Sequence, residues 1–173
     1  MRYFFLMTLF SVVVMTPTLL FGTMIGLSTE DLTRKSEVVI LGNVRQVETD
    51  WSEDGKTIQT RATILVSEVI KGKLAQGDII VEYAGGEIGD IGLRVSDVSP
   101  LSENERVILF LKSAKDKKNG ITYRIVGKAQ GKYTIDHHGI ARKGGFQVIH
   151  GREVIDNDIP ADELIKKIRR AAW

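Results

Sequence analysis

The pattern of apolar and polar residues predicts a long β-hairpin early in the chain. Apolar side chains dominate residues 37–49, and in residues 57–70 apolar or threonine positions alternate with polar ones. Such period-2 alternation is typical of a strand with one buried face, and β-branched side chains favour it further. Asp54 and Gly55 lie between the two stretches and suit a tight turn. We therefore expect antiparallel strands at Glu37–Thr49 and Thr57–Ile70.

The length of these strands points to a barrel. Strands of about 13 residues exceed the usual length of 5–6, and long strands in a small barrel must bend. Gly42 and the register change near Ser67 are positions where β-bulges would bend them. The predicted fold is mainly β, a five- or six-stranded antiparallel OB-like barrel, with an open meander as the alternative. Further strands are expected at Ile79–Tyr83, Arg106–Lys112, within Ile121–Ile135, and as a short edge at Phe146–His150.

Two helices are expected to flank the sheet. Ser28 precedes acidic residues and suits the cap of a short helix ending near Lys35. Pro160 suits the first turn of a C-terminal helix, in which Leu164 and Ile168 fall on one apolar face. We expect this second helix to pack on the barrel.

The first 22 residues are typical of an export signal. Arg2 is followed by a long uncharged, apolar run, and Gly22 ends the segment with a small residue. We expect cleavage after Gly22, which leaves residues 23–173 as a single domain. An uncleaved membrane anchor is the alternative, because 18 or more apolar residues can span a bilayer. In either case the domain is expected outside the cytoplasm, in the periplasm or the extracellular space.

Composition removes several classes of function. The chain has 173 residues and no cysteine, so it contains no disulfide, no thiolate metal site and no cysteine nucleophile. A net charge of +2 does not favour a nucleic-acid partner, and a membrane partner is expected only if the N-terminal segment is uncleaved. Hydrophobic content of 43% and charged content of 27% are ordinary for a folded domain.

Three stretches resemble a known family. They are Ser36–Val44, Ile64–Gly72 and Glu105–Leu111. With the export signal and flanking helices, they resemble the netrin-like module and the inhibitory domain of tissue inhibitors of metalloproteinases, and they are similar to exported bacterial proteins. The resemblance covers roughly residues 27–135 and implies an OB-type barrel with flanking helices. Inhibitors in that family bind the protease zinc through an N-terminal cysteine, so no inhibitory residue is carried over to this cysteine-free chain.

A binding surface is the leading functional expectation. Trp51 lies at the predicted hairpin tip, where an aromatic side chain can anchor a partner or fold back over the barrel end. Ala84–Pro100 is predicted to be a long irregular loop carrying Glu87 and Asp90, and such loops are often functional. A glycine-bearing barrel corner is the alternative for that loop. If this loop returns the chain to the opposite end, the lysine-rich turn Lys112–Gly120 joins the same rim.

Catalysis is the less favoured expectation. No serine lies in a nucleophile-elbow motif, and no acid/base pair of carboxylates is recognisable. His137, His138 and His150 are weak metal candidates, since adjacent residues on a strand point to opposite faces. The sequence therefore predicts a non-catalytic, cofactor-free protein- or peptide-binding module. The alternative is a metal-dependent hydrolase using these histidines.

Overall fold

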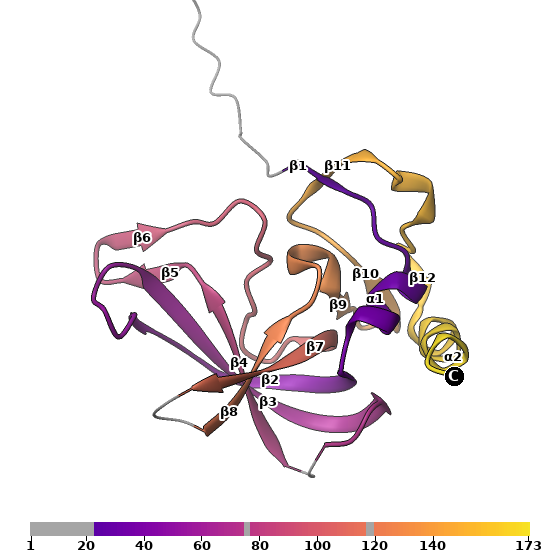
Figure 1. Ribbon diagram of the computed structural model, residues 1–173, viewed down its shortest axis with the longest axis horizontal. Helices are drawn as coiled ribbons and strands as arrows, with labels where there is room; N and C mark the ends of the chain where they lie inside the picture. Colours follow the sequence, from indigo (N-terminus) through magenta and orange to yellow (C-terminus); the bar gives the residue numbers. More distant parts are fainter. Residues whose placement is uncertain (1–22, 75–76, 117–119) are drawn as a thin grey trace, which may run out of the picture.

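The computed structural model describes residues 23–74, 77–116 and 120–173 (Figure 1). The predicted export signal, Met1–Gly22, lies outside them. The helices in the described residues are α1 (Thr29–Lys35) and α2 (Ala161–Ala171), with short 3-10 turns η1 (Lys128–Gly131) and η2 (Arg152–Val154). The strands there are β1 (Thr23–Ile25), β2 (Val38–Trp51), β3 (Ile58–Lys71), β4 (Asp78–Ala84), β5 (Gly86–Ile88), β6 (Ile91–Leu93), β7 (Arg106–Asp116), β8 (Gly120–Ile125), β9 (Lys132–Ile135), β10 (Ile140–Arg142), β11 (Gln147–His150) and β12 (Ile159–Pro160).

Five strands pair in a closed ring. The order of the main sheet is β12-β10-β9-β7-β2-β3-β4-β8, and β8 also pairs with β7. The ring is therefore β7-β2-β3-β4-β8, with β4 and β8 parallel at Val81 and Tyr123 and the other ring pairings antiparallel. The mainly β prediction is confirmed. The sheet has eight strands in the described residues instead of five or six, because β9, β10 and β12 extend it from β7.

Extra residues bend the two long strands where the sequence predicts. Leu41 is paired with Glu68 but the next residue, Gly42, is paired with Val66, so Ser67 is an unpaired bulge residue. A side chain at Gly42 would place its Cβ 2.7 Å from the Leu65 carbonyl oxygen. Gly42 thus allows β2 and β3 to stay close at the bend.

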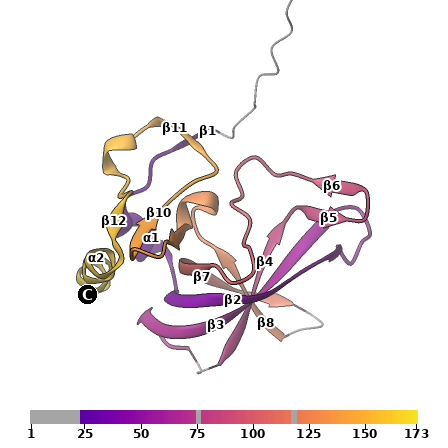
Figure 2. The same cartoon turned by 180° about the vertical axis from the view of Figure 1, so that it is seen from behind.

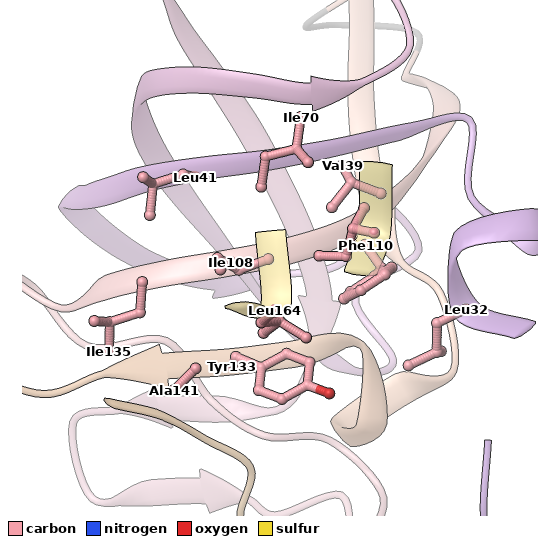
Figure 3. Close-up of a cluster of buried hydrophobic side chains, with 11 residues drawn as sticks. Leu32, Val39, Leu41, Ile70, Ile108, Phe110, Tyr133, Ile135, Ala141 and Leu164 are labelled. Atoms are coloured by element: carbon pink, nitrogen blue, oxygen red, sulfur yellow. The ribbon is translucent and has the colours of Figure 1, made fainter. Parts of the chain in front are cut away.

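Buried side chains form two clusters, one on each face of β2 and β7. One cluster gathers alternate residues of the ring strands, including Ile40, Ile64 and Leu109, all with no exposed surface. The other lies between the sheet and the helices (Figure 3). There the rings of Phe110 and Tyr133 pack with centroids 6.2 Å apart. Strand β7 is apolar on both faces because each face contacts a different cluster.

Both predicted helices are present and cover one side of the sheet (Figure 2). The Ser28 hydroxyl accepts the Asp31 N–H at 3.0 Å, which confirms the predicted cap. Helix α2 follows Pro160 and inserts Leu164 and Ile168, both fully buried, into the second cluster. Among the described residues, no helix is both long and apolar enough to cross a bilayer.

One prediction for the connections is wrong. Residues 84–100 are not wholly irregular, since β5 and β6 form a hairpin of their own. Ile88 pairs with Ile91, so Gly89 and Asp90 form a two-residue turn, and Gly89 has φ +57°. Glycine at the first central position is typical of such turns. The expected edge strand near His150 is confirmed as β11, which pairs parallel with β1.

Candidate functional site

The paired ends of β2 and β3 extend beyond the strand pairings of β7. Strand β7 pairs with β2 only from Val38 to Asn43, whereas the pairing of β2 with β3 continues to Trp51 and Ile58. We call residues 45–51 of β2 and 58–63 of β3 the arm. Strand β4 lines the arm on the β3 side, where Ala84 pairs with Gln59. The arm is thus a curved extension supported along one edge.

The β5–β6 hairpin crosses the arm at two threonines. Thr60 donates a hydrogen bond to the Gly85 carbonyl oxygen at 2.6 Å, and its hydroxyl lies 3.1 Å from that of Thr49. Gly86 has φ +132°, and a Cβ there would lie 2.4–2.5 Å from side-chain atoms of Thr60 and Thr49. Only glycine therefore lets the chain leave β4 and cross so close to the arm. Strand β5 is the strand of the hairpin that packs against β2 and β3.

A groove of about 940 Å³ lies beside this crossing. Its walls come from the arm, the end of β4, the hairpin and the loop after β6, and they include Val47, Thr49, Thr60, Tyr83, Glu87, Leu93, Arg94, Val95, Val98 and Leu101. A smaller hollow of about 420 Å³ shares Tyr83, Ala84 and Val98 with the groove. The two hollows therefore adjoin at the end of β4.

Tyr83 holds the floor of the groove in place. Its hydroxyl accepts the Leu101 N–H at 3.1 Å, and burial raises the pKa of the Tyr83 phenol. The phenol therefore stays neutral at physiological pH. The loop that carries Leu101 is fixed further along, where the Lys132 ammonium lies 2.8 Å from the Glu105 carboxylate in a mostly buried ion pair. The groove wall formed by this loop is thus anchored to the sheet at both points.

The predicted binding residues fall in different positions around the groove. Trp51 lies on the same face of β2 as Thr49, by the alternation of a strand, and is 44% exposed. Glu87 is exposed and belongs to the groove wall. Asp90 lies at the tip of the β5–β6 turn, outside the groove wall. The structure therefore brings the Trp51 end of the arm and Glu87 to one side of the molecule.

Strand β7, which leads to the lysine-rich turn, runs away from Trp51. Strand β7 runs antiparallel to β2, with Leu111 opposite Val38, so it ends beside the start of β2. The Ser113 N–H also donates to the Glu37 carboxylate at 3.0 Å. Trp51 is at the other end of β2, so the prediction that the turn Lys112–Gly120 shares its rim is wrong. Lys117 and Lys118 lie outside the described residues.

Several groove residues were not predicted from the sequence. Leu93 and Val95 fall in the stretch predicted to be irregular and Leu101 follows it, yet all three line the groove. The signal that would have found the hairpin is local, because Gly89 and Asp90 are flanked by isoleucines that pair across the turn.

The late histidines lie in two separate places. His137 and His138 belong to the exposed turn between β9 and β10, with ring centroids 3.9 Å apart, whereas His150 ends β11. Hydrogen bonds from the Ile140 N–H, Arg142 and the His138 N–H lower the pKa of Asp136, so that carboxylate organises the turn. In the part of the chain that the structure describes, no three histidine or acidic side chains form a potential metal site.

A second cluster of charged groups lies between the sheet and α2. The Lys143 ammonium is buried, lies 4.4 Å from the centre of the Tyr133 ring, and has no hydrogen-bond partner among the described residues. Burial lowers the pKa of Lys143 to about 7, although Asp156 nearby acts in the opposite direction. Asp156 is itself bound by the Lys167 ammonium at 2.8 Å and by the Thr29 hydroxyl at 2.5 Å. Within this cluster Lys143 is buried, whereas Asp156 and Lys167 are partly exposed.

No protein-family model matches this chain, and no curated protein sequence matches it.

Proposed function

We propose that the chain is an exported, non-catalytic module with an OB-like barrel that binds an extended peptide segment of a partner protein. The order of the ring, with its single parallel pairing between β4 and β8 and its long bent strands, supports the OB-like assignment. The uncharged apolar run after Arg2 supports export to the periplasm or the extracellular space.

The observation that carries the proposal is the groove between the arm and the β5–β6 hairpin. Its volume of about 940 Å³ falls within the usual range for ligand sites. Apolar side chains such as Val47 and Leu93 line it together with a few polar groups, including the Thr49 hydroxyl and the Glu87 carboxylate. Such walls provide apolar contact area and a small number of orienting groups.

An extended peptide fits this site better than a small molecule. The groove and the adjoining hollow share Tyr83, Ala84 and Val98, so together they offer more length for contact than one compact pocket does. Trp51 is not part of the groove lining, but it is half exposed and lies two residues beyond Thr49 of that lining, on the same face of β2, where a large aromatic side chain can contact a bound segment. Tryptophan is enriched among the residues that contribute most to the affinity of protein interfaces.

The test begins with selection of peptides that bind the purified protein from a displayed library. The tightest peptide is then titrated by fluorescence anisotropy against wild type, Trp51→Ala and Trp173→Ala. Trp173 is fully exposed next to the last residues of α2 and is therefore a matched control. We expect Trp51→Ala to weaken binding at least about tenfold, or about 1.4 kcal/mol, and Trp173→Ala to leave it unchanged.

The proposal is contradicted if a saturable peptide binds Trp51→Ala and Glu87→Ala as tightly as wild type. Thermal unfolding of each variant, followed by circular dichroism, shows whether lost affinity reflects lost folding. Trp51 and Glu87 are partly or fully exposed, so their replacement should leave the unfolding temperature nearly unchanged.

A further inference from the structure

Strand β6 is the outer strand of a two-stranded sheet (Figure 1). All three of its residues are exposed, with Ile91 at 55% and Leu93 at 37%. Isolated two-stranded hairpins are marginal in water, and an unpaired strand edge is a template for a further strand. Natural edges are often protected by lysine or proline, but β6 carries Ile91, Gly92 and Leu93.

The backbone of β6 shows which groups are available at that edge. Ile88 and Ile91 flank the two-residue turn and form the hydrogen-bonded pair next to it. Hydrogen-bonded and non-hydrogen-bonded pairs alternate along antiparallel strands, so Gly92 is in a non-hydrogen-bonded pair with Glu87. The N–H and C=O of Gly92 therefore point away from β5, toward the free edge.

We propose that β6 pairs antiparallel with β6 of a second copy of this chain, centred on Gly92, so that Asp90 lies opposite the partner's Arg94 and Arg94 opposite the partner's Asp90. The two copies then form a continuous four-stranded sheet around a two-fold axis, as self-complementary interfaces require. Gly92, Leu93 and Arg94 also line the groove, so this contact adjoins the proposed peptide site, although it does not rest on peptide binding.

The sequence around Gly92 is complementary to itself in this register. Asp90 and Arg94 lie two residues on either side of Gly92 and are both exposed. Asp90 is the second residue of the turn and Arg94 follows β6, so in the antiparallel arrangement these side chains flank the paired residues. The Asp90 carboxylate of each copy then lies beside the Arg94 guanidinium of the other, and the contact occurs twice. On the other face of the sheet Ile91 meets the partner's Leu93, again twice. Opposite charges and apolar pairs directly across two strands stabilise a sheet.

Other registers lose these contacts. The N–H and C=O groups that point to the free edge occur at every second residue. The pairing can therefore shift only between registers that keep outward-pointing residues of the two strands opposite one another. A symmetric pairing centred on Ile91 places Asp90 opposite the partner's Gly92, and one centred on Leu93 places Arg94 opposite that glycine. Neither arrangement pairs the two charges. The register centred on Gly92 is therefore the one that the side chains select.

The test is sedimentation analysis of the purified chain from about 1 μM to about 1 mM, because a contact of three residues per strand is small and is expected to be weak. The chain should pass from monomer to dimer over this range. Asp90→Arg and Arg94→Asp each put like charges opposite one another, and each should weaken dimerisation at least tenfold. The double variant Asp90→Arg/Arg94→Asp should dimerise like wild type.

Mixing the two single variants gives a second, sharper readout. In an equimolar mixture the two chains are complementary at both charged positions, so they should pair with each other although neither pairs with itself. Gly92→Pro removes the outward N–H and should abolish the dimer while the intramolecular pairing of β6 with β5 stays intact. Trp51→Ala should dimerise like wild type, which separates this contact from the groove.

Three results would overturn the proposal. They are a chain that is monomeric at the highest concentration, single charge reversals that dimerise as well as wild type, and a mixture of the single variants that stays monomeric.

Discussion

Replacing Lys143 with methionine should stabilise the protein, and the gain should depend on pH in a defined direction. The Lys143 ammonium is buried against the Tyr133 ring without a hydrogen-bond partner among the described residues. Methionine keeps most of the apolar stem and packs well against an aromatic ring, but it carries no charge to bury. The substitution therefore removes the free-energy cost of burying a charge and retains much of the packing against Tyr133.

The size of the effect follows from the pKa of Lys143, which burial lowers from 10.5 to about 7. Between these values the unfolded chain binds more protons than the folded one, so this group makes stability rise with pH. Each pKa unit corresponds to about 1.4 kcal/mol, so the full cost below pH 7 is about 5 kcal/mol. It falls to about 2 kcal/mol at pH 9 and vanishes above about pH 10.5.

Urea unfolding of wild type and Lys143→Met at pH 6 and pH 9 measures this difference. The advantage of the variant should be larger at pH 6 than at pH 9, by about 2–3 kcal/mol. Lys166→Met is the matched control, because Lys166 is an exposed lysine on α2. The control should change stability by less than about 0.5 kcal/mol at both pH values. An advantage for Lys143→Met that is equal at the two pH values would refute the reasoning.

Three further predictions concern the core, the hairpin and the N-terminus. Ile64→Ala or Leu109→Ala should each cost about 2–5 kcal/mol in urea unfolding, because both side chains are fully buried, and a loss below about 1 kcal/mol at both would contradict the assigned core. Gly86→Ala should speed hydrogen exchange of the β5–β6 amides, since its Cβ would collide with Thr49 and Thr60; unchanged exchange would contradict the described crossing. N-terminal sequencing of the exported protein should begin at Thr23, whereas a chain that keeps Met1 and needs detergent for extraction would be an anchored protein.

The long hairpin could be predicted because its signals are local. Alternation in residues 57–70 marks a strand with one buried face, and Asp54 with Gly55 marks its turn. Gly42 and Ser67 also indicated the bend, since glycine and a break in the alternation are the usual signs of a bulge. The starts of the two helices could be predicted because the Ser28 cap and Pro160 are also local signals.

Features that depend on distant segments could not be predicted. The parallel pairing of Val81 with Tyr123 closes the ring between strands that are some 40 residues apart, and no local pattern encodes it. The long glycine-bearing stretch was predicted to be irregular because its glycines outweighed the short hairpin signal at Gly89. Lys143 has no sequence feature that distinguishes it from a solvated lysine, because its burial arises from the way the C-terminal segment packs over Tyr133.

The most direct test of the binding groove uses the chain's own fluorescence. The chain has two tryptophans, Trp51 and Trp173, so Trp51 is the sole indole in a Trp173→Phe variant. Addition of a selected peptide should shift the Trp51 emission to shorter wavelength and protect it from acrylamide quenching, with the same Kd as anisotropy gives. A peptide that binds the Trp173→Phe variant with unchanged affinity, but leaves the emission and quenching of Trp51 unaltered, would contradict a binding site at the groove.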